Sequence, residues 1–179
     1  LAVQFIKAAF GIPTHTYGIG SDSPIMDGQC MSEGAMRSML IGLSGADILG
    51  AAGQLEVATT ISPIQLAIDN EVFGMVRRML TNITFDDESL AWPDLLRAEP
   101  GSNFLTGDHT LRHCRDGLMP TNFTRMTREE WNKQGPGDLV ARAGQYCKDL
   151  LEKATPTNLP EQVIREMDST VARADEQLG

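Results

Sequence analysis

Residues 14–20 and 46–52 read THTYGIG and ADILGAA, and these two stretches decide the fold. Both are short and rich in apolar or β-branched residues, a composition typical of buried strands. A helical stretch from Met26 to Leu43, ended by Gly45, separates them, and a second helix follows from Ser62 to about Leu80. Because strands and helices alternate with short loops, the pattern predicts an α/β fold of parallel strands joined by helical crossovers.

Capping signals support these helices. Asp22, Ser23 and Pro24 are expected to start the first, whereas Ser62 with Gln65 forms a capping box for the second. Residues 53–61 (GQLEVATTI) indicate a loop, and residues 1–10 a helix that Gly11 ends. The residues expected on the buried side of the second helix are Leu66, Val72, Phe73, Val76 and Leu80.

From residue 89 onward the pattern is helical. The expected helices cover 89–97, 108–115 with Asp108 as the cap, a stretch opened by a capping box at 127–130, 138–153 and 159–178. Two parallel strands cannot cover both faces of a sheet, so these residues predict a piece of a larger α/β protein. We therefore expect late βα units in residues 1–88 and a helical C-terminal extension, packed on them, in 89–179.

The composition excludes several classes of function. The 179 residues contain 15 Lys and Arg against 24 Asp and Glu, a formal net charge of −9, which disfavours nucleic acid as a partner. No apolar run is long enough to span a membrane, and no secretion leader is expected. The three cysteines are far apart and odd in number, which favours a reducing compartment and a cytoplasmic location.

Ligands of parallel sheets bind at the carboxyl ends of the strands, where loops and helix N-termini converge. Two segments hold such positions here: 17–29 after the first strand and 50–56 after the second. The candidate substrate-binding residues are Tyr17, Gly18, Gly20, Ser21, Asp22, Asp27, Gly50 and Glu56. The alternative roles are capping for Asp22 and Ser23, and a solvated loop charge for Glu56. No catalytic residue can be named.

Other chemistry-bearing residues have structural explanations. His109, His113 and Cys114 have helical spacing, but further metal ligands are not evident, so we expect no metal site. Cys30 is expected in the core, and His15 is expected to be structural. The methionines are expected to fill the core, and Trp92 and Trp131 are expected to be packing anchors.

Four strings resemble a known family. GIGSDSPIMDGQ (18–29), the stretch from LSGADILG to MVRRML (43–80), FLTGDHTLRHCRDG (104–117) and PEQVIREMDSTVARADEQL (160–178) together resemble the C-terminal portion of the trimethylamine methyltransferase family. The resemblance covers nearly the whole chain in order. It implies the late part of a (β/α)₈ TIM barrel, whose earlier part lies outside these residues.

The family resemblance also implies an activity: transfer of a methyl group from a tertiary or quaternary amine to the cobalt of a separate corrinoid protein. The chain itself would bind no cofactor and would be inactive as a fragment. A quaternary ammonium needs a site that holds a cation, for which Tyr17, Asp22, Asp27 and Glu56 are suited.

Two departures from the family pattern narrow the substrate. Founding members carry pyrrolysine near the position of Gly18 to Gly20, where this chain has only standard residues, so the resemblance implies a different substrate, such as a betaine. Members that act on glycine betaine carry histidine where this chain has Gly50, which argues against glycine betaine itself.

Two other functions remain open. Exposed strand edges and the acidic helical tail suit a non-catalytic interaction module or a homo-oligomer. A phosphate-binding α/β enzyme rests on Gly18 and Gly20 alone.

Overall fold

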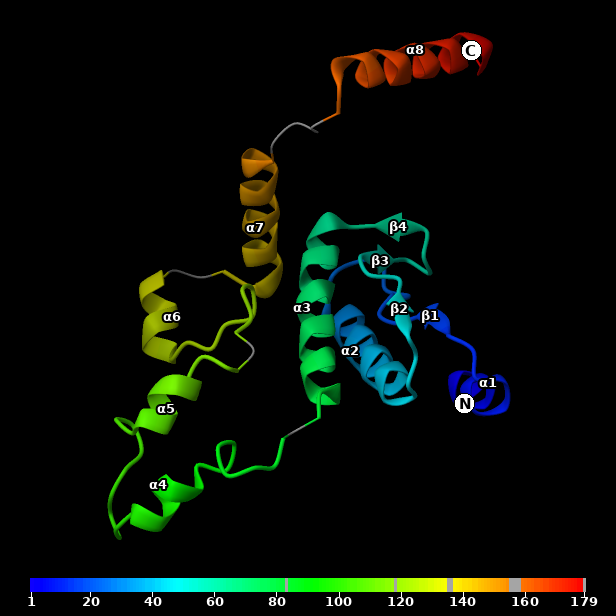
Figure 1. Ribbon diagram of the computed structural model, residues 1–179. Helices are drawn as coiled ribbons and strands as arrows, with labels where there is room; N and C mark the ends of the chain where they lie inside the picture. Colours follow the sequence, from blue (N-terminus) through cyan, green and yellow to red (C-terminus); the bar gives the residue numbers. More distant parts are fainter. Residues whose placement is uncertain (83, 118, 135–136, 155–158, 179) are drawn as a thin grey trace. The chain divides into compact units, whose positions relative to one another are not determined.

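The computed structural model describes residues 1–82, 84–117, 119–134, 137–154 and 159–178 (Figure 1). By internal packing the chain divides into two units, Leu1–Lys148 and Asp149–Gly179. The elements, in chain order, are α1 (Ala2–Phe10), β1 (His15–Tyr17), α2 (Gly28–Leu43), β2 (Ile48–Gly50), β3 (Gln54–Leu55), β4 (Thr60–Ile61), α3 (Pro63–Leu80), α4 (Trp92–Arg97), α5 (Asp108–His113), α6 (Arg128–Gln134), α7 (Leu139–Lys153) and α8 (Glu161–Leu178). The predicted boundary at residue 88, between late βα units and a helical C-terminal extension, stays a prediction.

The two expected strands pair in parallel. In β1 and β2, His15 lies opposite Ile48 and Tyr17 opposite Gly50, and the Gly18 N–H extends the pairing to the Gly50 carbonyl at 2.8 Å. Each strand spans three residues, fewer than the expected stretches 14–20 and 46–52. The ladders are short because, among the described residues, each strand pairs along one edge only. The α/β prediction is thus confirmed at the level of parallel strands with a helical crossover.

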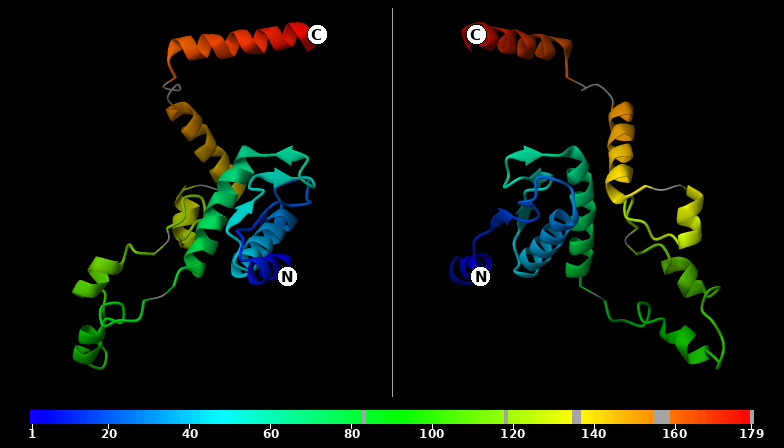
Figure 2. Two further views of the ribbon diagram at one scale, coloured as in Figure 1. Left: turned by 45° about the vertical axis from the view of Figure 1, so that its right-hand side comes forward. Right: turned by 180° about the vertical axis from the view of Figure 1, so that it is seen from behind.

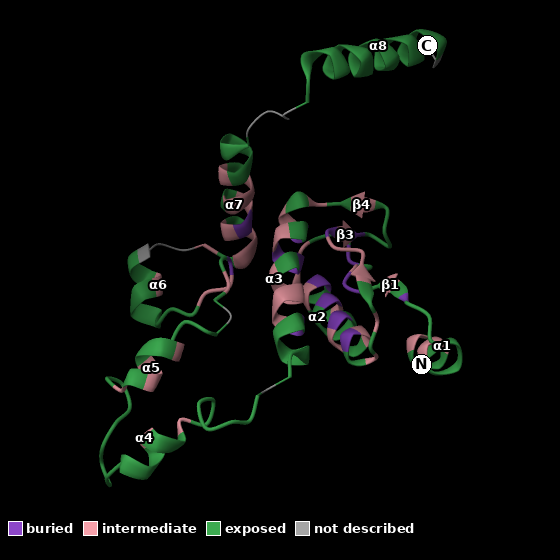
Figure 3. Cartoon of the chain, viewed as in Figure 1, coloured by how far each residue is buried: buried purple, intermediate pink, exposed green. Residues whose placement is uncertain are grey.

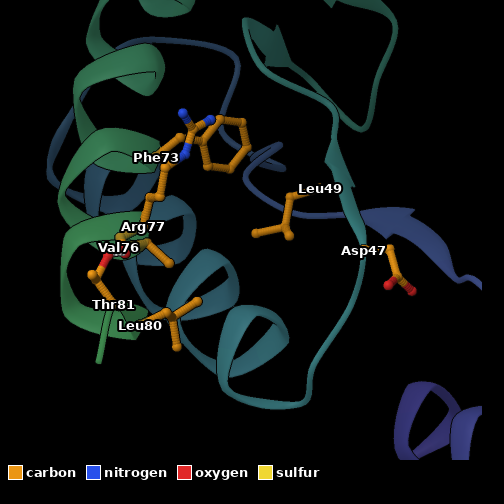
Figure 4. Close-up of a pocket in the computed structure, with 7 residues that line it drawn as sticks. All are labelled: Asp47, Leu49, Phe73, Val76, Arg77, Leu80 and Thr81. Carbon is orange, nitrogen blue, oxygen red and sulfur yellow. Dashed lines mark hydrogen bonds between the residues drawn. The ribbon is translucent and has the colours of Figure 1, made fainter. Parts of the chain in front are cut away.

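Helices cover one face of this sheet. α2 packs against α3 and β2 (Figure 2). Leu49 points from β2 toward α3, where it lines a cavity of about 380 Å³ with Phe73, Val76 and Leu80 (Figure 4). The opposite face is open, because Tyr17 is 67% and Ile48 59% exposed. In Figure 3, α2 carries buried residues along its length, whereas α1 carries none.

Residues 53–61, expected to form a loop, contain a small antiparallel hairpin. Gln54 of β3 pairs with Ile61 of β4, and Leu55 pairs with Thr60. Three consecutive residues in the left-handed region, Glu56, Val57 and Ala58 with φ of 52°, 54° and 67°, make the turn. None of them is a glycine, and for this reason no turn was predicted at these residues.

α2 begins later than its sequence signals indicated. The N-cap is Asp27, whose carboxylate accepts the Cys30 N–H at 2.9 Å, so Asp22, Ser23 and Pro24 do not start this helix. α1 ends at Gly11 in the left-handed conformation, as expected. The Lys7 ammonium of α1 pairs with Asp47 at 2.8 Å and so joins this helix to the start of β2.

α3 begins where predicted, but the residues that it buries differ from the prediction. The Ser62 hydroxyl accepts the Gln65 N–H at 3.2 Å, but the Gln65 side chain turns to Asp69 and does not close the capping box. Val76 is buried as expected, whereas Leu66 and Leu80 are 47% and 41% exposed. Ile68 and the polar pair Gln65 and Asp69 are buried on this helix.

The remaining helices follow the expected order with shifted ends. α4 starts at Trp92, not near residue 89, and α5 is capped by Gly107, so Asp108 is the first helical residue and not the cap. Trp92, expected to be a packing anchor, is 51% exposed and is therefore poorly packed within the described residues. None of the helices in the described ranges combines the length and apolar character needed to cross a bilayer.

Local capping by polar side chains is confirmed at α6 and α7. Thr127 and Glu130 bond each other's backbone N–H groups at 2.8 and 3.3 Å, which completes the predicted capping box. The Asp138 carboxylate accepts the Ala141 N–H at 2.8 Å. All three cysteines are free thiols, and Cys30 is buried as expected.

One carboxylate on α3 holds the segment before α6. Glu71 accepts the backbone N–H groups of Thr121, Asn122 and Phe123 at 2.8, 2.6 and 3.1 Å, and the Asn122 amide at 2.9 Å. Asn122 is buried, and its carbonyl accepts from the Arg142 guanidinium of α7 at 2.8 Å. The segment 121–123 and, through Arg142, the start of α7 therefore dock on α3 through this cluster.

We expect Glu71→Gln to destabilise this docking. A neutral amide presents a donor to one of the N–H groups and weakens the bonds to the others, at a cost of about 2 kcal/mol. Urea unfolding measures the loss. Glu129→Gln is the matched control, since Glu129 pairs with exposed Lys133 in an i,i+4 contact. Equal stability of the two variants would contradict this role of Glu71.

Candidate functional site

The carboxyl ends of β1 and β2 bring the two candidate segments together. Beyond the paired glycines, the Ser21 N–H donates to the Gln54 carbonyl at 3.1 Å, and the Glu56 N–H to the Ser23 carbonyl at 3.0 Å. The loop that follows β1 therefore runs beside the hairpin that follows β2. Residues 17–27 and 50–56 share one edge of the sheet.

Two glycines at this edge allow close approach within the protein itself. A Cβ on Gly18 would lie 2.8 Å from the Leu49 Cβ and 3.3 Å from the Gly50 carbonyl oxygen. A Cβ on Gly50 would lie 2.6 Å from Nε2 of His15. The packing of β1 on β2 thus requires Gly18, while the imidazole of His15 occupies the space above Gly50.

The loop acids are held by a network in which Glu33, not singled out from the sequence, is central. Its carboxylate accepts the buried Ser21 hydroxyl at 2.8 Å and the Asp22 N–H at 3.0 Å, and these bonds lower the pKa of Glu33. Arg37 lies 3.5 Å from the Asp22 carboxylate and donates to the Gly20 carbonyl at 2.6 Å. The i,i+4 spacing of Glu33 and Arg37 was the sequence signal that could have pointed to Glu33.

Asp27 is committed to structure. Besides the Cys30 N–H, its carboxylate accepts the Ser23 hydroxyl at 3.1 Å. The Cys30 N–H is the main reason that the pKa of Asp27 is lowered. Asp22 and Asp27 therefore shape the loop after β1. Glu56 is exposed, and its carboxylate accepts the Thr60 hydroxyl at 2.7 Å in a solvent-facing contact.

The open face of the sheet carries Tyr17 and His15. Alternation along β1 places these two exposed side chains on the face away from α2, and Gly50 of β2 lies on the same face. His15 was expected to be structural. The period-two spacing of positions 15 and 17 was the signal that could have grouped it with Tyr17.

A buried carboxylate of α3 accepts a hydrogen bond from the residue that precedes the hairpin. Asp69 of α3 is 2% exposed and accepts the Gly53 N–H at 2.7 Å and the Gln65 amide at 2.6 Å. Burial raises the pKa of Asp69 to about 6, against the opposing effect of these two bonds. The Gln65 Oε1 atom is buried without a hydrogen-bond partner in the described part of the chain.

The remaining candidates lie elsewhere. His109 and His113 share a face of α5, with ring centroids 4.4 Å apart, whereas the Cys114 thiol turns to the Leu111 carbonyl at 3.5 Å. Burial raises the pKa of the Cys30 thiol, which fits a core residue and not a nucleophile.

Comparison with known proteins identifies the class as a methyltransferase family. The family model for trimethylamine methyltransferase (MTTB) matches residues 4–179, and this chain belongs to that family. The trimethylamine methyltransferase MttB of Desulfitobacterium hafniense is 31% identical over 170 residues, 95% of this chain and 34% of that protein. MttB of Methanosarcina barkeri (strain Fusaro) is 30% identical over 174 residues, 97% of this chain and 35% of that protein.

A relative that is named for another substrate matches a similar share of this chain. The glycine betaine methyltransferase of Desulfitobacterium hafniense (strain Y51) is 27% identical over 172 residues, 95% of this chain and 36% of that protein. The chain spans about a third of the length of these relatives. The resemblance seen in the sequence is thus confirmed for a portion of the family's length.

We expect Gly18→Ala to separate the two strands. The added methyl group meets the Leu49 Cβ and the Gly50 carbonyl, neither of which can move without the backbone, and overpacking of this kind costs about 1–3 kcal/mol. Urea unfolding measures the effect. Gly28→Ala is the matched control, because no atom lies within 4 Å of its added Cβ. A Gly18→Ala variant as stable as this control would contradict the role given to Gly18.

We expect stability to fall as pH rises through the Asp69 titration. The folded pKa of about 6 exceeds the ordinary value of 3.8, so between these values the folded state holds a proton that the unfolded chain has released. The stabilisation present below pH 4 is lost by about pH 7, a change of about 3 kcal/mol.

Asp69→Asn tests this titration. The neutral amide can accept the Gly53 N–H and donate to the Gln65 Oε1 once that amide turns over, so we expect a more stable protein above pH 6 and a flatter profile. Thermal unfolding monitored by circular dichroism across this pH range provides the measurement, with exposed Asp168→Asn as the control. An unchanged slope in the Asp69 variant would show that another group titrates.

Proposed function

We propose that the protein transfers a methyl group from a tertiary or quaternary amine to a corrinoid protein, as part of a longer chain. Membership of a family whose named members are trimethylamine and glycine betaine methyltransferases supports the reaction. The single structural observation that carries the proposal is the open face of the β1–β2 pair. At its carboxyl end this face carries the Tyr17 ring, and the adjacent hairpin carries the Glu56 carboxylate.

The open face suits the interior of a barrel. Parallel sheets are covered on both faces, and here α2 and α3 supply only the outer cover. In a (β/α)₈ barrel, further strands would close around His15, Tyr17 and Ile48, and the active site would lie at the carboxyl ends. The segments 17–27 and 50–56 occupy that end, and this supports their assignment to the substrate pocket.

The residues present fit a cationic substrate. The Tyr17 ring offers a π face for a quaternary ammonium, and the carboxylate of Glu56 offers a counter-charge from the adjacent hairpin. Asp22 and Asp27 contribute through the loop backbone that they order, since their carboxylates bond Arg37 and the start of α2. The corrinoid, carried by its own protein, would supply the methyl acceptor. This chain's residues bind the amine and orient one methyl group toward the barrel mouth.

Glu56 sits in a strained turn, which supports a role in binding. The three left-handed residues 56–58 each cost energy, and such backbone is retained where the surrounding structure fixes it. The bonds from Glu56 N–H to Ser23 and from Thr60 to the Glu56 carboxylate hold the turn. These bonds fix the position of the carboxylate relative to the loop after β1.

The test uses the full-length protein with a reduced corrinoid protein and a panel of tertiary and quaternary amines. Formation of methylcobalamin, followed by absorbance, reports transfer. We expect Tyr17→Leu to lower kcat/KM about tenfold through loss of the cation–π contact, and Tyr17→Phe, which keeps the ring, to stay near the unaltered protein. Transfer from none of the amines would reject the proposed activity.

The second candidate, an interaction or oligomerisation module, is favoured by a different observation. An apolar groove of about 440 Å³ lies between α2 and α3, lined chiefly by Met31, Met39, Met75, Met79 and Phe123. Methionine-rich grooves adapt to partners. Sedimentation of the full-length protein distinguishes the two candidates: an isolated monomer that transfers methyl groups favours the enzyme.

A further inference from the structure

A cluster outside the sheet edge joins two histidines to a carboxylate. Oε1 of Glu88 lies 3.0 Å from Nε2 of His113, and the Glu88 carbonyl lies 2.7 Å from Nε2 of His109. One ligand atom from each of these three residues lies within 4.8 Å of the other two. No other group of three such side chains occurs at this spacing in the ranges that the structure describes.

Local sequence builds this cluster. His109 and His113 are four residues apart on α5 and therefore share its face. Glu88 is held by a turn in which Asp86 and Ser89 bond each other's backbone N–H groups at 3.0 and 2.7 Å. The cluster thus depends on one stretch of chain between positions 84 and 116.

We propose that Glu88, His109 and His113 form a binding site for a divalent transition-metal ion of the zinc type. Two imidazoles and one carboxylate are a ligand set that zinc takes in proteins, with a fourth position left for water. Ligands of one tetrahedral ion lie roughly 3–3.5 Å apart, so the observed spacing requires only small side-chain rotations.

The surroundings support this assignment. The Asp116 carboxylate lies 2.6 Å from Nδ1 of His113, the arrangement by which a carboxylate orients a metal-bound imidazole. Cys114, the third ligand that sequence spacing offered, faces the Leu111 carbonyl and takes no part. No metal site was expected from the sequence, because no further ligand and no metal-binding motif were evident near the two histidines. Glu88 lies 21 positions before His109.

One cation competes for the same carboxylate. The Arg112 guanidinium lies 3.2 Å from Oε1 of Glu88, with a side chain 61% exposed, and can turn into solvent when an ion binds. Arg78 also lines the hollow around the cluster. A bound ion would link the turn at 86–91 to α5. It would thereby hold together the two ends of the segment that contains α4.

The test titrates the metal-free full chain with Zn²⁺ against a fluorescent zinc indicator. We expect one ion bound at micromolar concentration or below, and loss of this binding in Glu88→Gln, His109→Ala and His113→Ala. Asp116→Asn should weaken binding about tenfold. Because Glu88→Gln alters an exposed side chain and keeps the backbone carbonyl, it tests the site even if a histidine variant loses its fold by circular dichroism.

The controls remove the same residue types elsewhere. His15→Gln replaces the third histidine of the chain, and Cys114→Ser replaces the neighbouring thiol; both should bind Zn²⁺ normally. Co²⁺ should give tetrahedral absorption bands without thiolate charge transfer. Binding only at millimolar Zn²⁺, binding that survives in Glu88→Gln, or binding lost in Cys114→Ser would overturn the proposal.

Discussion

A parallel sheet must be covered on both faces, and this requirement governs the structure. The pairing of β1 with β2 places Leu49 against α3 and leaves Tyr17 and Ile48 in the open. The free energy of burial is gained on one face only, at about 25 cal/mol per Å² of apolar surface. The exposed face is therefore the place where the rest of the protein, as proposed for a barrel, would add its strands.

The site follows from how the strand ends are held. Backbone bonds join the loop after β1 to the hairpin after β2, and the Asp69 carboxylate fixes Gly53 from the helix side. This carboxylate is buried and has a raised pKa, so the fold accepts an energetic cost at this position. Together these contacts place an aromatic ring and an acidic turn at one edge, the chemistry suited to a cationic amine.

Polar contacts join the segment 121–123 and the start of α7 to α3. Glu71 binds four N–H donors of the segment at 121–123, and Arg142 then bonds the Asn122 carbonyl. The Glu88 cluster is a second polar contact of this kind, between a turn and α5. Because such charge-assisted bonds are directional, they fix the orientation of the segments that they join.

The sequence by itself determined the order of the helices, the parallel pairing of β1 with β2 and the caps at Ser62 and Thr127, and it missed the hairpin at 54–61. The caps were readable because a capping signal acts over a few residues. The family was also evident from ordered strings along the whole chain. Only the tertiary structure decided that Gln65 and Asp69 are buried and that Glu33, Glu71 and Glu88 hold distant groups. A carboxylate carries no sign of its partner in its local sequence, since the partner is set by how the chain folds back on itself.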